Sequence, residues 1–231
     1  MKESRAIEYW TEPRECCDAA WEAAYARFET RAEEAEKFRR RLRGFGIEAW
    51  SRELEIVELC CGRGGGLDAW RSLGFGKLEG VDISATLLQA HKGEARLYVG
   101  DCRRLEFPDA SRDVVCVQGG LHHLAALPED LEATIAEARR VLRPGGRLVV
   151  VEPWMTPFLA TVHAVCGLGW ARWTSPKIAA LADMIEHERE TYFNWLGRGP
   201  EILGVLTRNF ATEQKRIAWG KLAWLGRKTA T

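Results

Sequence analysis

The chain of 231 residues suits one domain of ordinary size with room for added segments, and it can bury a substantial core. It carries 33 Lys and Arg against 33 Asp and Glu, so its zero formal net charge argues against nucleic acid as a partner. Hydrophobic residues at 46% and charged residues at 29% exclude a disordered chain and are typical of a folded, soluble protein.

Cysteine usage indicates a reducing compartment. The seven cysteines include adjacent pairs at 16–17 and 60–61 but no CxxC motif, a pattern unlike a secreted disulfide framework. The first 15 residues, MKESRAIEYWTEPRE, lack the apolar stretch that a signal peptide needs. We therefore expect a cytoplasmic protein.

Residues 1–50 are expected to form an N-terminal helical cap. Apolar and aromatic side chains recur at spacings of three and four from Trp21 onward, which predicts an amphipathic helix, or two, over residues 14 to 43. The basic run KFRRRLR (37–43) suits a helix C-terminus, where cations meet the helix dipole, and Gly44 follows it.

After Trp50, short apolar runs alternate with helical segments, which is typical of an α/β domain. The alternation predicts a mostly parallel sheet with helices on both faces, built by residues 51–153. The expected strands are 54–59, 77–83, 95–101, 113–120 and 147–153, and the expected helices are 67–75, 84–92 and 128–142.

The stretch from 148 to 171 is nearly uncharged and long enough to span a bilayer by count. We expect no membrane span, because an acid, two prolines and a histidine interrupt it, and mid-membrane acids are costly. The interrupting residues are Glu152, Pro153, Pro157 and His163.

The remaining residues are expected to complete the site and the sheet. Residues 154–209 are rich in aromatic side chains, which predicts a helical lid over an apolar, partly planar substrate. Residues 210–231 fit two closing strands turned at Gly220, which would carry an antiparallel edge.

The segment ELCCGRGGG (58–66) between the first strand and helix of this core raises the question of its ligand. A phosphate-binding Walker loop needs Lys and Ser or Thr after its last glycine, and here Leu67 and Asp68 follow. A metal or redox site at Cys60 and Cys61 is disfavoured, because adjacent thiolates point apart and no second pair has ligand spacing.

A dinucleotide fingerprint is harder to dismiss. Gly64, Gly66 and Ala69 match its relaxed form, with Asp82 about twenty residues after the loop. The match begins beyond the strand end, however, and Glu58 would face the phosphates. An NAD(P)-dependent oxidoreductase therefore remains a third hypothesis.

Five segments follow one another along the chain: VELCCGRGGG (57–66), GVDIS (80–84), VGDCRRLEFPDASRDVV (99–115), QGGLHHL (118–124) and EARRVLRPGGRLVVVEP (137–153). Together, and in this order, they resemble the motifs of the class I S-adenosylmethionine (SAM)-dependent methyltransferases, of the type 11 and small-molecule kind. Glu58 stands where the family usually has Asp, and Cys60 replaces the first glycine of its first motif.

The resemblance implies a single domain over residues 1–231 with a Rossmann-like sheet of about seven strands, the last one antiparallel. It implies SAM as methyl donor, S-adenosylhomocysteine as product and no metal. Glu58 would orient the methionine part, Asp82 would bind the ribose hydroxyls, and Asp101 would meet the adenine amino group. The full set of cofactor-binding candidates is Glu58, Cys60, Gly62, Gly64, Asp82, Ile83, Asp101, Cys102 and Gln118.

His122 and His123 follow the fourth strand and are the candidates for a general base, since an imidazole pKa can lie near 7. A hydrogen-bonded, pocket-lining role is the alternative, and the sequence leaves both open. The acceptor pocket is expected from the cap and the lid, with Trp154, His163, Tyr192 and Trp195 as candidates.

The predicted function is methyl transfer to a small, apolar or planar molecule by in-line displacement. The segment QGGL lacks the [ND]-P-P-[YF] motif of DNA and protein-amide methyltransferases, which favours a small acceptor over nucleic acid. A non-catalytic SAM-binding regulatory or scaffolding protein is the alternative. The acceptor atom, and the choice between monomer and homodimer, are not specified by these residues.

Overall fold

The computed structural model describes residues 7–14 and 19–229, so Cys16, Cys17 and the first turn of the predicted N-terminal helix lie outside it. One eight-stranded sheet forms the centre, in the order β1-β4-β3-β2-β5-β6-β8-β7. Its strands are β1 (Glu8–Tyr9), β2 (Glu55–Leu59), β3 (Lys77–Asp82), β4 (Arg96–Val99), β5 (Arg112–Gln118), β6 (Leu142–Pro153), β7 (Ala211–Ala218) and β8 (Lys221–Arg227).

The direction of the strands follows the prediction of a mostly parallel sheet. Strands β1 to β6 pair in parallel, while β8 runs antiparallel to both β6 and β7. The turn between β7 and β8 contains Gly220, whose φ of 73° is the left-handed conformation that glycine adopts most easily. The sheet has one strand more than expected, because β1 is only two residues long and too short to leave a pattern in the sequence.

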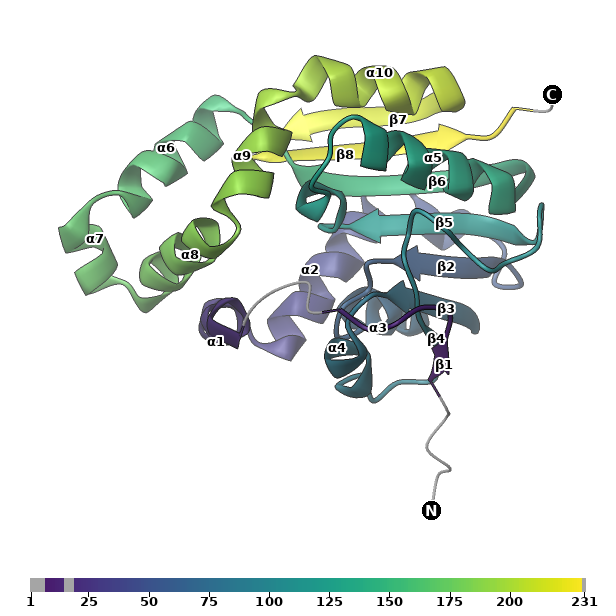
Figure 1. Cartoon of the computed structure of the whole chain (residues 1–231), viewed down its shortest axis with the longest axis horizontal. Coiled ribbons are helices and arrows are strands. Elements are labelled where there is room, and N and C mark those ends of the chain that lie inside the picture. Colours follow the sequence, from purple (N-terminus) through teal and green to yellow (C-terminus); the bar gives the residue numbers. More distant parts are fainter. Residues whose placement is uncertain (1–6, 15–18, 230–231) are drawn as a thin grey trace.

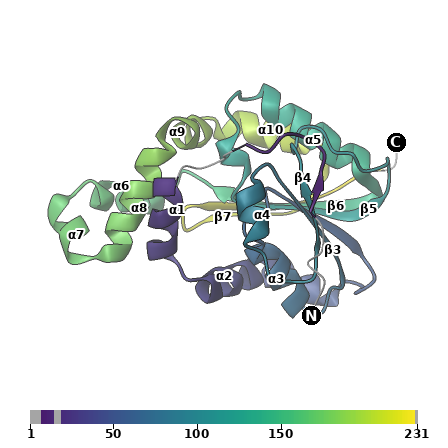
Figure 2. The same cartoon turned by 60° about the horizontal axis from the view of Figure 1, so that its bottom comes forward.

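Helices cover both faces of the sheet (Figures 1 and 2). The helices that precede β6 are α1 (Ala19–Phe28), α2 (Arg31–Arg43), α3 (Gly65–Ser72), α4 (Ala85–Gln89) and α5 (Glu129–Val141), with short 3-10 turns η1 (Ile47–Ala49) and η2 (Leu121–His123). The later helices are α6 (Pro157–Cys166), α7 (Gly169–Thr174), α8 (Pro176–His187), α9 (Arg189–Gly197) and α10 (Gly199–Asn209).

The segment predicted as one or two N-terminal helices forms two. Thr30 separates them, because its side chain accepts a hydrogen bond from the Glu33 backbone while the Glu33 side chain accepts one from the Thr30 backbone. This reciprocal capping satisfies orphan N–H groups at the start of α2. Ser84 caps α4 with a single bond, in which its hydroxyl accepts from the Leu87 N–H, as its position before the helix predicts.

Two hydrophobic clusters lie on opposite faces of the sheet. Within β2, Val57 and Leu59 belong to the cluster beneath α5 and α10, whereas Ile56 belongs to the cluster beneath α2 and α3. This alternation is the period of two that a strand buried on both faces requires. The core therefore fixes which face of the sheet each side chain of β2 meets.

Helices α6, α7 and α8 extend beyond the carboxyl ends of the parallel strands (Figure 1). Helix α1 packs against α8, and an ion pair of 2.8 Å joins Arg27 to Asp183. Helix α10 packs instead on α5 and buries Ile202, Val205 and Leu206 over the sheet. Among the described residues, no helix has the length and apolar character needed to cross a bilayer.

Candidate active site

A cleft of about 470 Å³ opens at the carboxyl ends of β2, β3 and β5, where ligands bind in open α/β sheets. Its volume lies within the range of about 300–1,000 Å³ usual for small-molecule sites. Eight of the nine predicted cofactor residues line it, at strand ends or in the loops that follow them: Glu58, Cys60, Gly62, Asp82, Ile83, Asp101, Cys102 and Gln118.

The glycine loop between β2 and α3 has a strongly curved backbone. Gly62 and Gly64 have φ angles of 51° and 82°, which side-chain-bearing residues rarely adopt. Cys60 adopts 52° although it carries a side chain. Its Cβ occupies the space that a side chain at position 120 would need, and residue 120 is glycine. Gly64 is not among the residues that line the cleft.

Glu58 is a buried carboxyl group with an unfilled hydrogen-bonding position. Its side chain lies in the cleft wall at 3% exposure, and only Oε1 has a partner, the amide Nε2 of Gln118 at 3.4 Å. Oε2 has no hydrogen-bond donor among the described residues. Burial raises the pKa of Glu58 to about 8. The wall of the cleft thus holds an acid that lacks a cation.

Asp82 ties β3 to the glycine loop. Its Oδ2 accepts a hydrogen bond from the Gly62 N–H at 2.8 Å, and its Oδ1 accepts one from the Ser84 N–H at 2.9 Å. Burial raises the pKa of Asp82 in spite of these two donors. Each oxygen keeps a second lone pair, so the carboxylate can still accept a bond from a ligand in the cleft. Ile83 follows and lines the same wall.

Asp101 is held by a residue that the sequence analysis did not single out. The Arg103 guanidinium contacts both carboxylate oxygens, with Nη2 at 2.6 Å from Oδ2, and this bonding lowers the pKa of Asp101. Arg103 also donates to Asp130 at 2.7 Å and lines the cleft. The sequence could have indicated this pair, because Arg103 follows the strand-end Asp101 by two residues.

The two histidines differ in position and charge. His122 is 6% exposed, lies outside the cleft and bonds through Nδ1 to Glu152 at 2.8 Å. Burial alone would lower the pKa of His122, but its contacts with Glu152 and Glu188 raise it to about 10. His123 lines the cleft, and burial together with the neighbouring His122 charge lowers its pKa to about 4.

Glu152 is a fully satisfied carboxylate at the end of β6. Its Oε1 accepts the backbone N–H groups of Gly120 and Leu121, both at 2.9 Å, and its Oε2 meets His122. Although burial opposes ionisation, these partners lower the pKa of Glu152. The carboxylate therefore anchors η2 and fixes the orientation of the His122 ring.

The four predicted acceptor-pocket residues lie outside this cleft. Trp154 and Trp195 pack in the core, and the Trp195 indole donates to the Pro153 carbonyl at 2.8 Å. His163 Nε2 lies 3.1 Å from the Tyr192 hydroxyl, in a separate aromatic group with Phe193. Aromatic content alone could not distinguish rings that pack the later helices from rings that line the cleft.

The aromatic side chains that do line the cleft come from the N-terminal helices. Trp21 and Tyr25 of α1 stack at 5.1 Å, and Phe38 of α2 lies with them in the wall. Their helical spacing had placed Trp21 and Tyr25 on one face. These rings run along the cleft from the glycine loop, where the Arg63 guanidinium lies over the Tyr25 ring at 4.7 Å, to His123, beside which Trp21 lies. We call the end beside His123 the aromatic end of the cleft.

Comparison with known protein families gives a match to the methyltransferase domain model over residues 57–150. A demethylmenaquinone methyltransferase from Symbiobacterium thermophilum is 32% identical over 126 residues, which are 46% of this chain and 49% of that protein. The chain thus spans about half the length of this curated relative.

Two solved structures show the same fold. A candidate SAM-dependent methyltransferase from Methanococcus maripaludis has a TM-score of 0.63 at 12% identity, covering 96% of this chain and 97% of that one. The 1,6-didemethyltoxoflavin N1-methyltransferase of Burkholderia thailandensis, solved with 1,6-didemethyltoxoflavin and S-adenosylhomocysteine bound, has a TM-score of 0.51 at 18% identity, covering 92% and 79%.

These matches agree with the architecture described above, a mostly parallel sheet with one antiparallel strand and helices on both faces. The predictions of fold and family are confirmed: residues 57–150 match the methyltransferase domain, and the fold is that of class I SAM-dependent methyltransferases.

Proposed function

We propose that this protein transfers a methyl group from SAM to a small planar or apolar molecule. The family match supports the reaction, and the cleft at the carboxyl ends of the strands supports a small ligand. The observation that carries the proposal is the buried Glu58 carboxyl group, which lies at the glycine loop with one oxygen unpartnered.

The residues present fit SAM better than a dinucleotide. SAM carries an ammonium and a sulfonium group but no phosphate, so a cation can satisfy the orphan Oε2 of Glu58. The bare backbone at Gly62 allows a ligand to approach the loop closely, since nothing lies within 4 Å of the position a Cβ would take. A pyrophosphate carries no cation that could satisfy Oε2 of Glu58.

The other carboxylates have roles that follow from their contacts. Asp82 is fixed by the N–H groups of Gly62 and Ser84, and we assign its free lone pairs to the ribose hydroxyls. Asp101 is oriented by Arg103 and is assigned to the adenine amino group, beside the Cys102 backbone. Because Arg103 already neutralises the Asp101 carboxylate, we expect Asp101 to contribute less to SAM affinity than Asp82 does.

The acceptor is assigned to the aromatic end of the cleft. Trp21, Tyr25 and Phe38 supply flat apolar surface against which a planar ring packs. The relatives named for demethylmenaquinone and 1,6-didemethyltoxoflavin act on compounds with planar ring systems, which agrees with this assignment.

SAM supplies an electrophilic methyl group, and the protein's part is to align the acceptor with it. Holding a nucleophile about 3 Å from the methyl carbon provides much of the acceleration of an in-line displacement. Of the two candidate histidines, His123 faces the cleft with a neutral ring, whereas His122 is protonated and bonded to Glu152. We therefore place His123 next to the acceptor and give His122 a positioning role.

Calorimetry tests the donor, and radiolabelled SAM tests the reaction. SAM and S-adenosylhomocysteine are expected to bind at one site per chain, and NAD is expected to give no heat. Label from SAM should then move to a small planar compound in a metabolite extract. Binding of NAD in place of SAM would overturn the assignment of the cleft, while SAM binding without any transfer would leave a non-catalytic SAM-binding protein.

A further inference from the structure

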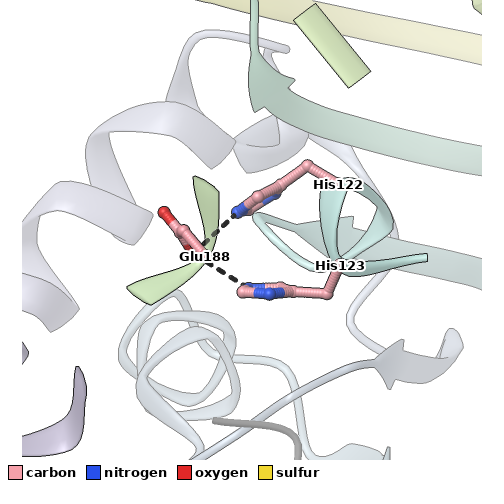
Figure 3. A group of neighbouring side chains, drawn as sticks. All are labelled: His122, His123 and Glu188. Atoms are coloured by element: carbon pink, nitrogen blue, oxygen red, sulfur yellow. Dashed lines mark ion pairs between the residues drawn. The ribbon is translucent and has the colours of Figure 1, made fainter. Parts of the chain in front are cut away.

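His122 and His123 on η2 and Glu188 at the junction of α8 and α9 converge on one point beside the cleft (Figure 3). We propose that these three side chains bind a divalent transition-metal ion of the zinc class. Glu188 is not among the residues that line the cofactor cleft. The site brings together two segments of the chain that are more than sixty residues apart.

The spacing of the three ligand atoms is that of an open metal site. Each histidine Nε2 lies 3.7 Å from Glu188 Oε2, which is too long for a hydrogen bond. All three potential ligand atoms lie within 4.8 Å of one another. Zinc bonds of about 2.0–2.2 Å in tetrahedral geometry separate ligand atoms by about 3.4 Å. Small side-chain movements therefore bring the three atoms to coordination distance.

The surroundings hold the ligands in place. A metal-binding histidine usually donates its second ring N–H to a carboxylate, and His122 Nδ1 lies 2.8 Å from Glu152. This bond leaves Nε2 as the ligating atom of His122. Glu188 accepts a hydrogen bond from the Trp21 indole at 3.2 Å, which fixes the third ligand.

The charge balance also favours a dication. Glu152 and Glu188 have side chains that are 0% and 10% exposed, and among the described residues neither pairs with Lys or Arg. A divalent ion between neutral imidazoles compensates both carboxylates, so metal binding relieves an electrostatic cost that the protein otherwise carries.

The ligand set identifies the class of ion. Two imidazoles and one carboxylate are borderline ligands suited to Zn²⁺ and its transition-metal neighbours, whereas Mg²⁺ prefers oxygen ligands alone. Three protein ligands leave a fourth position open, the arrangement of catalytic zinc sites. His123 and Trp21 line the cleft, so this position faces its aromatic end.

The location narrows the acceptor chemistry, and this step rests on the proposed methyl transfer. An acceptor hydroxyl that reaches the fourth position would ionise more readily, because a bound cation lowers the pKa of an oxygen ligand. Its proton leaves to solvent, the oxygen forms a bond to the methyl carbon, and the sulfur keeps the electron pair of the broken bond. The metal site therefore points to a phenol or quinol oxygen.

Calorimetry on the full chain, dialysed against chelator, tests the site with Zn²⁺, Co²⁺ and Mg²⁺ salts as probes. One Zn²⁺ per chain is expected, together with the visible absorption of low-coordinate Co²⁺ and no heat from Mg²⁺. His123→Gln and Glu188→Gln should each weaken Zn²⁺ binding at least tenfold. His187→Gln is the matched control, because His187 is exposed at the end of α8 and contributes no atom to the group.

Thermal unfolding and SAM binding complete the test. Zn²⁺ should raise the melting temperature of the parent and of His187→Gln but not of the other two variants. Absence of stoichiometric Zn²⁺ binding to the folded parent would overturn the proposal, as would unchanged affinity in both His123→Gln and Glu188→Gln. SAM calorimetry on the same samples separates this result from a failure of the proposed function, because the three residues lie outside the glycine-loop end of the cleft.

Discussion

Two buried glutamates of the cleft region differ in how the fold satisfies them. Glu152, behind η2 and outside the cleft, accepts hydrogen bonds from two backbone N–H groups and contacts His122, and its pKa is lowered. Glu58, at the glycine-loop end, has one long hydrogen bond and a pKa raised to about 8. The fold supplies hydrogen-bond partners for both oxygens of Glu152, whereas Oε2 of Glu58 is left for a ligand. The number of hydrogen-bond partners, and not burial, therefore distinguishes the ligand-binding carboxyl group from the structural one.

The strongest test applies the same substitution at both positions. Glu152→Gln leaves the buried His122 charge without its nearer ion-pair partner, with only Glu188 at 3.7 Å remaining, so we expect the free energy of unfolding to fall by about 3 kcal/mol. Glu58→Gln replaces a largely protonated carboxyl group by a neutral isostere and should not destabilise the protein at pH 7. Urea denaturation of both variants measures the difference, and equal losses would remove the contrast.

The pH dependence of stability sharpens the contrast at Glu58. The pKa of Glu58 rises from an ordinary 4.5 to about 8 on folding, so between these values the folded state holds a proton that the unfolded state has lost. Stability attributable to this group is therefore present at low pH and is lost as pH rises, by on the order of 5 kcal/mol at most.

The measurement is the free energy of unfolding of the parent and of Glu58→Gln, obtained by urea denaturation at pH values from 5 to 8. The variant should gain stability relative to the parent as pH increases, since Gln does not titrate. A difference that stays constant over this range would show that Glu58 is ionised in the folded protein and has a partner.

The smallest effects concern SAM affinity at the two strand-end aspartates. Asp82→Ala is expected to weaken SAM binding at least tenfold, because hydrogen bonds to a charged group contribute about 1.5–3 kcal/mol. Asp101→Asn should weaken it only about threefold, since Arg103 already engages that carboxylate. Calorimetry with SAM orders the two, and a larger loss at Asp101 would reverse the assigned roles.

The core and the glycine-loop end of the cleft could be predicted from local sequence. Buried parallel strands leave short apolar runs, and the acids that end them, such as Asp82 and Asp101, must reach one edge of the sheet. The pairing of His122 with Glu152 could not be predicted, because it joins residues thirty positions apart through the sheet. The sequence placed Glu152 only inside an apolar run.

The later helices were harder to place for a different reason. Trp195 and Trp154 are aromatic residues of a segment expected to cover the ligand, yet both pack in the hydrophobic core against the sheet and neighbouring helices. Helical periodicity identifies an apolar face but not the surface that it meets. Glu188 shows the same limit, since its place beside two histidines depends on how α8 and α9 join.

The contact between Cys60 and Gly120 links two loops that no motif connects. A side chain fits at position 60 only because position 120 has none, and the family's usual glycine at position 60 leaves that space open. A side chain at position 120 is therefore expected to be tolerated only if position 60 is glycine. Cys60 and Gly120 are thus coupled by volume, although they belong to separate loops.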